Sequence, residues 1–257
     1  ITAIENSCPN LPLHFKGAAQ VFVAGMSKAS ESRSGDWVNQ FTGRANECLV
    51  EAEKVLNLIP DVSSEFLQHG MVILTRGFDP MVANVLNMAA SDGRQFHVVI
   101  TEGRPQDDSA RLAQSLDHPN LKITIIPDSA VGVWINKAHA VLIGTDLVLE
   151  DGSLIAPVGT YTMCVLANVH RKPVYCACET FKFMRSFVLS QSDMQKYQRK
   201  LEYQPSGPKV NNAQPVEYDA DEFDYTPAKF VTLLLTEKGP MPPSAVTHGL
   251  TKLLGVS

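Results

Sequence analysis

The sequence has no apolar run of about 18 residues, so we expect no membrane-spanning helix and no membrane partner. Basic residues are not in excess: 22 Lys and Arg stand against 27 Asp and Glu, and a net charge of −5 argues against nucleic acid as a partner. The N-terminus ITAIENSCPN lacks the basic start and long apolar block of a signal peptide. We therefore expect a cytoplasmic protein.

Cysteine is scarce, and its pattern predicts neither disulfides nor a metal. The chain has five cysteines, an odd number without a short disulfide framework, which fits a reducing compartment. Cys176 and Cys178 share one face of an apolar strand, and no further ligands lie nearby. We therefore favour buried packing over metal or redox chemistry for this pair and expect no metal site.

Nucleotide-binding motifs are also missing, since neither GxxxxGK[ST] nor GxGxxG occurs. What is present is an alternation of strands and helices. Three short apolar runs without polar alternation predict strands covered on both faces: Leu121–Ile126, Ala140–Gly144 and Pro173–Cys178. Between them, helices are predicted to begin at Asp128-Ser129 and at Gly159-Thr160. This layout is typical of a parallel α/β sheet.

Further strands extend the sheet in both directions along the chain. Met71–Thr75 and Phe96–Thr101 are predicted before the three runs, and Phe230–Thr236 after them. Asp79-Pro80 and Asp107-Asp108 stand where helices should start. We thus predict an α/β domain over residues 69–257, with a long polar loop at about 190–222.

Residues 1–68 are predicted to form a separate helical domain. One helix starts at Asn10-Leu11-Pro12, and a second, longer one runs from Trp37 until Pro60 interrupts it. Such helices cannot bury their apolar stripes alone, so they should pack on the sheet or on another chain. The abrupt start suggests that earlier helices precede this sequence.

The carboxyl ends of the predicted strands carry polar residues, where ligands bind in sheets of this kind. Asp146 follows one such strand. It either caps a turn or is a carboxylate of a pocket, where it would act as a base or hold sugar hydroxyls. Its position alone favours the two interpretations equally.

Four other features could hold an anion at the same edge: Arg104, Arg111, Lys182 and the Gly159-Thr160 helix start. Each alone is more often a structural ion-pair partner. Their common placement at strand ends and helix starts favours a shared crevice.

These segments also carry a family resemblance over most of the chain, from about residue 37 to the C-terminus. The phrases LTRGFDPMVANVL, VVITEGRPQDDSARLAQSL, GTDLVLEDGSLIAPVGTYTMCVLA and KPVYCACETFKF resemble successive blocks of one superfamily. It contains the regulatory subunits of eukaryotic translation initiation factor 2B and the ribose-1,5-bisphosphate and methylthioribose-1-phosphate isomerases. ETFKF, MRSFVLSQSDM and DYTPAKFVTLLLT are most similar to the alpha subunit. The resemblance implies an N-terminal helical domain on a Rossmann-like, mainly parallel sheet with helices on both faces.

The resemblance also bears on catalysis. The isomerases pair a cysteine after the first strand with an aspartate, and here those positions are Gly77 and Asp146. Glycine has no titratable group for the proton transfer that isomerisation needs. The lysine before the enzymes' GTY is also replaced, by Ala156-Pro157. Arg104 and Arg111 match phosphate-contacting positions, so the resemblance implies a vestigial pocket without catalytic residues.

The implied role is that of a non-catalytic regulatory subunit of the factor 2B guanine-nucleotide exchange complex. It would pair with itself, join the beta and delta subunits, and sense the phosphorylated alpha subunit of initiation factor 2. Basic candidates for the phosphoserine are Lys16, Lys28, Arg33, Arg44 and Lys54. The alternative is an active phosphosugar aldose–ketose isomerase. No cofactor is expected, although a sugar phosphate or nucleotide could occupy the pocket.

Overall fold

The computed structural model of the chain describes residues 12–29, 37–203 and 216–254. Its centre is a seven-stranded sheet in the order β11-β10-β7-β4-β1-β2-β3. Six strands are parallel and β11 runs antiparallel to β10. The bounds are β1 Val72–Arg76, β2 Phe96–Thr101, β3 Leu121–Ile126, β4 Ala140–Ile143, β7 Val174–Ala177, β10 Leu233–Thr236 and β11 Gly239–Met241.

Helices cover both faces of this sheet, because successive strand residues point to opposite sides. Ile73 joins one buried cluster with Val55, Ile59 and Leu86, while Leu74 joins the other with Met163 and Leu250. The helices on the first face are α3 (Trp37–Ser64), α4 (Pro80–Ser91) and α5 (Ser109–Ser115); those on the second are α6 (Val131–Trp134), α7 (Thr160–Val169) and α8 (Val246–Leu254). The predicted fold class is confirmed.

A second, smaller sheet has the order β8-β5-β6-β9. Its strands are β5 (Leu147–Leu149), β6 (Leu154–Pro157), β8 (Phe183–Met184) and β9 (Phe223–Thr226). Leu147, Ile155 and Tyr225 pack there against Leu13, just before the first described helix. The described residues also contain short 3-10 turns between these elements: η1 Asp128–Ala130, η2 Thr180–Lys182, η3 Gln191–Lys196, η4 Ala228–Phe230 and η5 Pro243–Ala245.

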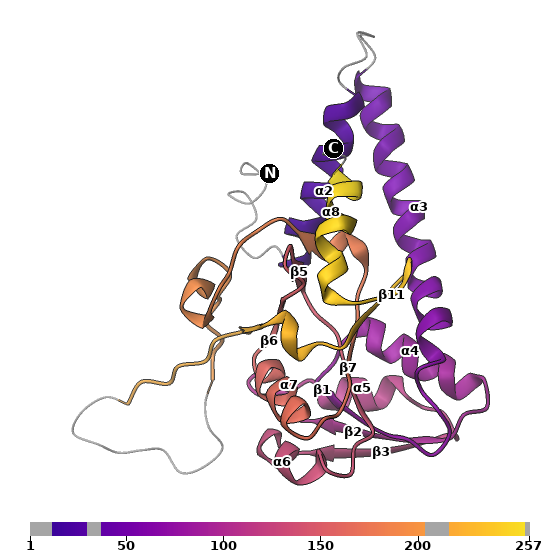
Figure 1. Cartoon of the computed structure of the whole chain (residues 1–257), viewed down its shortest axis with the longest axis vertical. Coiled ribbons are helices and arrows are strands. Elements are labelled where there is room, and N and C mark those ends of the chain that lie inside the picture. Colours follow the sequence, from indigo (N-terminus) through magenta and orange to yellow (C-terminus); the bar gives the residue numbers. More distant parts are fainter. Residues whose placement is uncertain (1–11, 30–36, 204–215, 255–257) are drawn as a thin grey trace.

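The helices α2 (His14–Ala29) and α3 rise together from the sheet as a pair (Figure 1). The prediction that Pro60 interrupts the second helix is wrong: α3 continues through Pro60 to Ser64. The buried side chains of Ile59 and Pro60 hold this turn in place, so packing outweighs the missing proline N–H. Farther up, Leu49 is 64% exposed. Among the described side chains of α3, Val55 and Ile59 near its lower end are thus buried against the sheet, whereas Leu49 is not. The predicted domain boundary at residue 68 remains a prediction.

Three local expectations need correction. β3 is the edge strand and is only partly buried, so it is not covered on both faces. The strand predicted at Phe230–Thr236 is β10, which begins at Leu233 because residues 228–230 first form a 3-10 turn after Pro227, and one more strand, β11, follows it. The helix predicted to begin at Asp128-Ser129 opens as the 3-10 turn η1 before α6, and the Asp128 carboxylate accepts hydrogen bonds from the Gly103 and Arg104 N–H groups at 3.0 and 2.8 Å. Part of the predicted polar loop, residues 204–215, lies outside the described residues.

Candidate functional site

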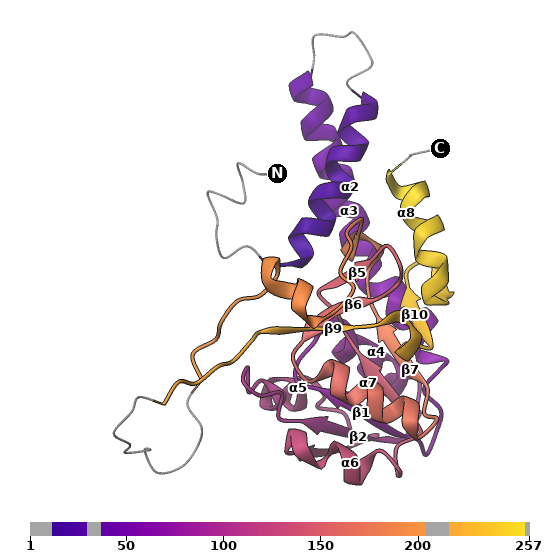
Figure 2. The same ribbon diagram turned by 60° about the vertical axis from the view of Figure 1, so that its left-hand side comes forward.

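A cavity of about 330 Å³ opens at the carboxyl ends of β1, β4 and β7. The chain runs outward from β1 to β2 and β3, and then returns to the other side of β1 as β4. The sheet order therefore reverses here, where α/β sheets bind ligands. Figure 2 shows α2 and α3 standing over this end of the sheet. The polar side chains that line the cavity are His14, Arg76, Asp79, Thr145, Asp146, Thr160, Glu179 and Lys182.

Asp79 and Lys182 form the charged centre of the cavity wall. The Asp79 carboxylate caps α4, accepting hydrogen bonds from Met81 N–H at 2.8 Å and Val82 N–H at 3.0 Å. Burial raises the pKa of Asp79, and the Lys182 ammonium opposes that rise. The buried Lys182 Nζ lies 2.8 Å from Glu179 Oε2. Burial alone would lower the pKa of Lys182, but Asp79 and Glu179 outweigh it and raise that pKa.

Arg76 forms the next part of the wall. Its Nη2 donates to Arg104 O at 3.1 Å and to Gln106 Oε1 at 2.9 Å. Burial lowers the pKa of Arg76, and the charge of Asp128 acts in the opposite direction. Its buried Nε has no hydrogen-bond partner in the described part of the chain. A β-carbon on Gly159 would lie 3.1 Å from that atom, so the bare backbone of Gly159 leaves room for the guanidinium.

The start of α7 is occupied by an aspartate distant in sequence. The buried Asp224 accepts hydrogen bonds from Gly159 N–H at 2.7 Å and Tyr161 N–H at 3.0 Å. Burial raises the pKa of Asp224 to about 6 despite these bonds. The predicted anion cradle at Gly159-Thr160 is therefore filled by the protein itself, although Thr160 still lines the cavity.

Gly77 lies directly beside Asp108. A β-carbon on Gly77 would come within 2.4 Å of Asp108 Oδ1, and Gly77 has a φ of +50°. That carboxylate oxygen is buried and has no hydrogen-bond partner in the structure as described. Burial raises the pKa of Asp108, and a hydrogen bond from the Phe78 N–H opposes the rise. The Asp108 carboxylate thus fills the space that a side chain at position 77 would need.

Asp146 lines the cavity, and its side chain is 24% exposed. Its Oδ1 lies 3.7 Å from Nδ1 of His14, the first residue of α2. Its backbone N–H donates to Ile155 O at 3.0 Å. This placement supports the interpretation of Asp146 as a carboxylate of the cavity, with the His14 imidazole beside it.

The predicted arginines do not line this cavity. Arg104 is exposed and pairs with Asp107 at 3.1 Å and Glu102 at 3.5 Å. Arg111 is exposed, and its guanidinium lies 3.9 Å from the centre of the Phe78 ring. The structure therefore brings Asp146, Thr160 and Lys182 together at the cavity, with Gly159 beside Arg76, and leaves Arg104 and Arg111 outside its walls.

The described cysteines take no part in the cavity. Cys164, Cys176 and Cys178 are free and buried. Burial raises the pKa of the Cys164 thiol, and Asp224 raises it further. Cys8 and the side chain of Cys48 lie outside the described residues. Within the described ranges, no group of three or more His, Cys, Asp or Glu side chains is arranged to hold a metal ion.

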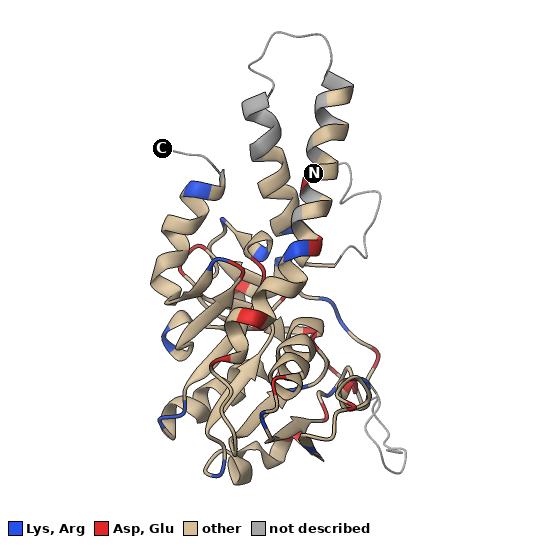
Figure 3. Ribbon diagram, turned by 90° about the vertical axis from the view of Figure 1, so that its right-hand side faces the viewer, with Lys and Arg blue, Asp and Glu red and all other residues tan. Residues whose placement is uncertain are grey.

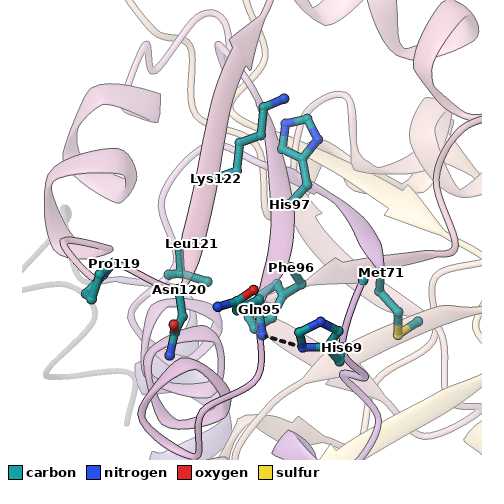
Figure 4. Close-up of a pocket in the computed structure, with 10 residues that line it drawn as sticks. His69, Met71, Gln95, Phe96, His97, Pro119, Asn120, Leu121 and Lys122 are labelled. Atoms are coloured by element: carbon teal, nitrogen blue, oxygen red, sulfur yellow. Dashed lines mark hydrogen bonds between the residues drawn. The ribbon is translucent and has the colours of Figure 1, made fainter.

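A second hollow of about 440 Å³ lies at the opposite, amino-terminal ends of β1, β2 and β3 (Figure 4). His69 Nδ1 accepts a hydrogen bond there from Gln95 N–H at 3.3 Å. Lys122 is its one charged lining residue other than histidine. Because ligands of parallel sheets bind at the carboxyl ends, we take the first cavity as the candidate site.

Charges of both signs are interspersed on the face shown in Figure 3. Of the basic candidates, Lys16 lies 5.8 Å from the centre of the Tyr197 ring and Lys54 is exposed. Arg33 and the side chains of Lys28 and Arg44 lie outside the described residues. A search of the described helices found none with the length and hydropathy needed to cross a bilayer.

Sequence reasoning missed several residues of the site. Arg76 stands at the end of β1, so the rule that pointed to Asp146 could have found it, as that rule does mark Glu179 after β7. Asp79 was assigned only to a helix start. His14 and Asp224 gave no local signal, because contacts with residues far away in the sequence bring them to the site.

Comparisons with known proteins agree with this architecture. The profile of the Initiation factor 2 subunit family matches residues 16–243. Translation initiation factor eIF2B subunit alpha of Dictyostelium discoideum is 33% identical over 96% of this chain and 80% of its own length. The same subunit of Caenorhabditis elegans is 34% identical over 73% of this chain, which spans only 60% of that protein. Ribose 1,5-bisphosphate isomerase of Archaeoglobus fulgidus is 27% identical, covering 82% of this chain and 67% of its own.

Solved structures give the same fold. A Pyrococcus horikoshii translation initiation factor eIF-2B superposes with a TM-score of 0.67 at 25% identity, over 79% of this chain and 70% of that one. A chain of the tetrameric eIF2B-beta2-delta2 complex from C. thermophilum reaches a TM-score of 0.76 at 18% identity, over 98% of this chain and 77% of that one. The family profile and the two alpha-subunit relatives show that this chain belongs to the initiation factor 2B subunit family and is alpha-like within it.

Proposed function

We propose that the chain is a non-catalytic regulatory subunit of the factor 2B guanine-nucleotide exchange complex, acting in the cytoplasm. The observation that carries the non-catalytic part is the contact at Gly77. The position that the resemblance matches to the cysteine of the isomerases is a glycine here, and a β-carbon on it would have to displace the Asp108 carboxylate, whose Oδ1 would lie 2.4 Å away.

Activity measurements test this part. Incubation with ribose 1,5-bisphosphate or methylthioribose 1-phosphate should give no ketose above the rate without protein. The isomerase alternative has support in the likeness to ribose 1,5-bisphosphate isomerase and in the cavity position of Asp146. Turnover by the wild-type chain that disappears in the Asp146→Asn variant would establish that alternative.

The second part of the proposal is an assembly role: the chain pairs with itself and binds the beta and delta subunits. The name of its Dictyostelium relative supports this role. So do Phe187 and Leu189, which are 74% and 81% exposed, because neighbouring exposed apolar side chains mark interaction surfaces.

Light scattering should report a homodimer, and tagged chain should retain beta and delta subunits on a column. The double variant Phe187→Ser/Leu189→Ser should weaken self-association. Val169→Ser, which changes a side chain that is 68% exposed elsewhere on the molecule, serves as the matched control. A wild-type monomer that retains neither subunit would refute the assembly role.

The third part is sensing of the phosphorylated alpha subunit of initiation factor 2. A phosphoserine adds close to two negative charges and binds best to Arg or Lys. An exchange assay on the reconstituted complex should slow when initiation factor 2 is phosphorylated, and this response should vanish when the chain is left out. An equal response with and without the chain would exclude sensing by it.

A further inference from the structure

The small sheet ends at β9, which has a neighbouring strand, β6, on one side only. Alternate residues of an antiparallel strand direct both their N–H and their C=O groups to the same side. In β9 the backbone groups of Phe223 and Tyr225 form their hydrogen bonds on the side away from β6. An edge with free groups of this kind is a template on which another strand can add.

Two glutamine amides occupy this open side of β9. Gln198 Nε2 donates to Phe223 O at 2.6 Å, and Gln198 Oε1 accepts from Phe223 N–H at 3.2 Å. Gln191 Nε2 donates to Tyr225 O at 2.7 Å, and Gln191 Oε1 accepts from Tyr225 N–H at 2.9 Å. A side-chain amide carries the same donor and acceptor as a peptide group, so each glutamine takes the place of one residue of a paired strand.

Backbone groups supply the rest of this ladder. Leu201 N–H donates to Ala220 O at 2.9 Å, and Glu222 N–H donates to Arg199 O at 3.0 Å. This short antiparallel pairing stops where β9 begins, and the two glutamines continue it along the strand. The outward N–H and C=O groups of both aromatic residues of β9 therefore have partners within the chain.

The turn between the two glutamines holds them in place. Gln191 is the first residue of η3, and Gln198 stands two residues after its end. Met194 and Tyr197 are 1% and 6% exposed and join the buried cluster that contains the aromatic residues of β9. η3 therefore lies beside β9 (Figure 2). Because its own backbone is coiled into a 3-10 turn, only side chains of this segment can complete the ladder.

We propose that Gln191 and Gln198 form an intramolecular substitute for a fifth strand, which closes the edge of the small sheet against strand addition by a second copy of the chain. The two side chains satisfy the edge without presenting a new one, because η3 offers no extended backbone of its own. This inference does not rest on the proposed function, since self-association through Phe187 and Leu189 would leave β9 closed.

Hydrogen exchange of single backbone amides tests the ladder. Gln198→Met and Gln191→Met nearly keep the length of the side chain but remove its amide group. Gln198→Met should speed exchange of the Phe223 amide roughly tenfold and leave the Tyr225 amide slow, and Gln191→Met should do the reverse. Each variant is thus the control for the other. Gln114→Met, at an exposed position of α5, should change the exchange of neither amide.

The double variant Gln191→Met/Gln198→Met tests the closure. Light scattering at about 100 µM should give at least about twice the mass of the wild type at the same concentration, whatever the oligomeric state of the wild type. The Phe223 and Tyr225 amides should exchange fast in dilute solution and slowly again at high concentration, because a strand of the second copy then protects them. The amide of buried Val98 in β2 should stay slow throughout if the large sheet remains folded.

Three results would each overturn the inference. Equal exchange of the Phe223 amide in the wild type and in Gln198→Met would show that the glutamine does not bond the edge. Faster exchange without added mass in the double variant would show that the amides stabilise β9 but exclude no second copy. Added mass without renewed protection would assign the association to another surface. The single variants decide the first point even if the double variant does not fold.

Discussion

At the scale of single residues, the site depends on close contacts between carboxylates and bare backbone. Asp79 approaches Gly144, and Asp108 approaches Gly77, so in each case a glycine leaves room for an aspartate. Burial raises the pKa of both carboxyl groups. These contacts make the glycines and the aspartates energetically dependent on one another, which can be measured.

A double-mutant cycle should reveal the coupling between positions 77 and 108. Gly77→Ala should destabilise the chain by about 1 to 2 kcal/mol from the positive φ alone, and by more because the new methyl group displaces the Asp108 carboxylate. In the Asp108→Ser background the same change should cost less, with a coupling of at least about 0.5 kcal/mol. Urea unfolding of the four proteins gives the values. Strict additivity would mean that Asp108 moves aside without cost.

The pKa of Asp224 predicts how stability depends on pH. The folded protein keeps this proton up to about pH 6, while an ordinary aspartate releases it near 3.8. Between these values the folded state binds more protons, so stability falls as pH rises through the window, by up to about 3 kcal/mol. Asp224→Asn should remove this part of the slope. Free energies of unfolding at pH 4, 5, 6 and 7 for both proteins check it, and parallel curves would contradict the assignment.

At the scale of elements, local sequence signals predict the positions of the strands more accurately than the exposure of each strand or the ends of the helices. β2 and β3 were predicted with their exact bounds, because apolar β-branched runs bounded by polar residues are strong signals. Two other outcomes depended on tertiary contacts. Pro60 lies inside α3 because buried neighbours hold that turn, and β3 is half-exposed because it happens to be the edge. The same holds for the candidate site. Its residues at strand ends can be found from the sequence, whereas the partners that come from elements far away in the sequence cannot.

The hairpin of β5 and β6 offers a test at this scale. Gly152, in its turn, has a φ of +83°, and a β-carbon there would lie 2.4 Å from the backbone oxygen of Pro243 in η5. Gly152→Ala should therefore lower stability by more than about 2 kcal/mol, since both strain and a backbone clash oppose it.

Gly239 is the matched control for this prediction. Its φ is +100°, but a β-carbon there meets nothing within 4 Å, so Gly239→Ala carries the strain without the clash. Thermal melting of the two variants should separate these contributions. Equal losses of stability in the two variants would mean that η5 moves away from the hairpin at no cost in free energy.

At the scale of the whole molecule, the N-terminal helices and the sheet share the candidate cavity. His14 of α2 and Leu56 of α3 line it together with residues at the strand ends. α2 also approaches η2 closely: a β-carbon on Gly17 would lie 2.7 Å from the backbone oxygen of Phe181. The segment that carries Lys182 is therefore in direct contact with the first described helix.

Gly17→Ala should loosen this docking. The new methyl group meets backbone atoms of Phe181 and Lys182, which cannot rotate away, so we expect a loss of about 2 kcal/mol or more and faster hydrogen exchange in α2. Gly43→Ala in α3 is the control, because its β-carbon meets nothing within 4 Å. It should stabilise the chain by up to about 1 kcal/mol through helix propensity. A stabilising Gly17→Ala would show that α2 is not held against η2.

The contact between Gly77 and Asp108 also limits the evolutionary routes open to this chain. A mutation that places a cysteine at position 77 brings its β-carbon within 2.4 Å of the Asp108 carboxylate and must adopt a φ of +50°. Loss of Asp108 would remove this clash, but it would also remove one of the negative charges that offset buried Arg76. A single substitution that puts a reactive side chain at this position is thus opposed twice, by the strain of a positive φ and by the displacement of a buried carboxylate.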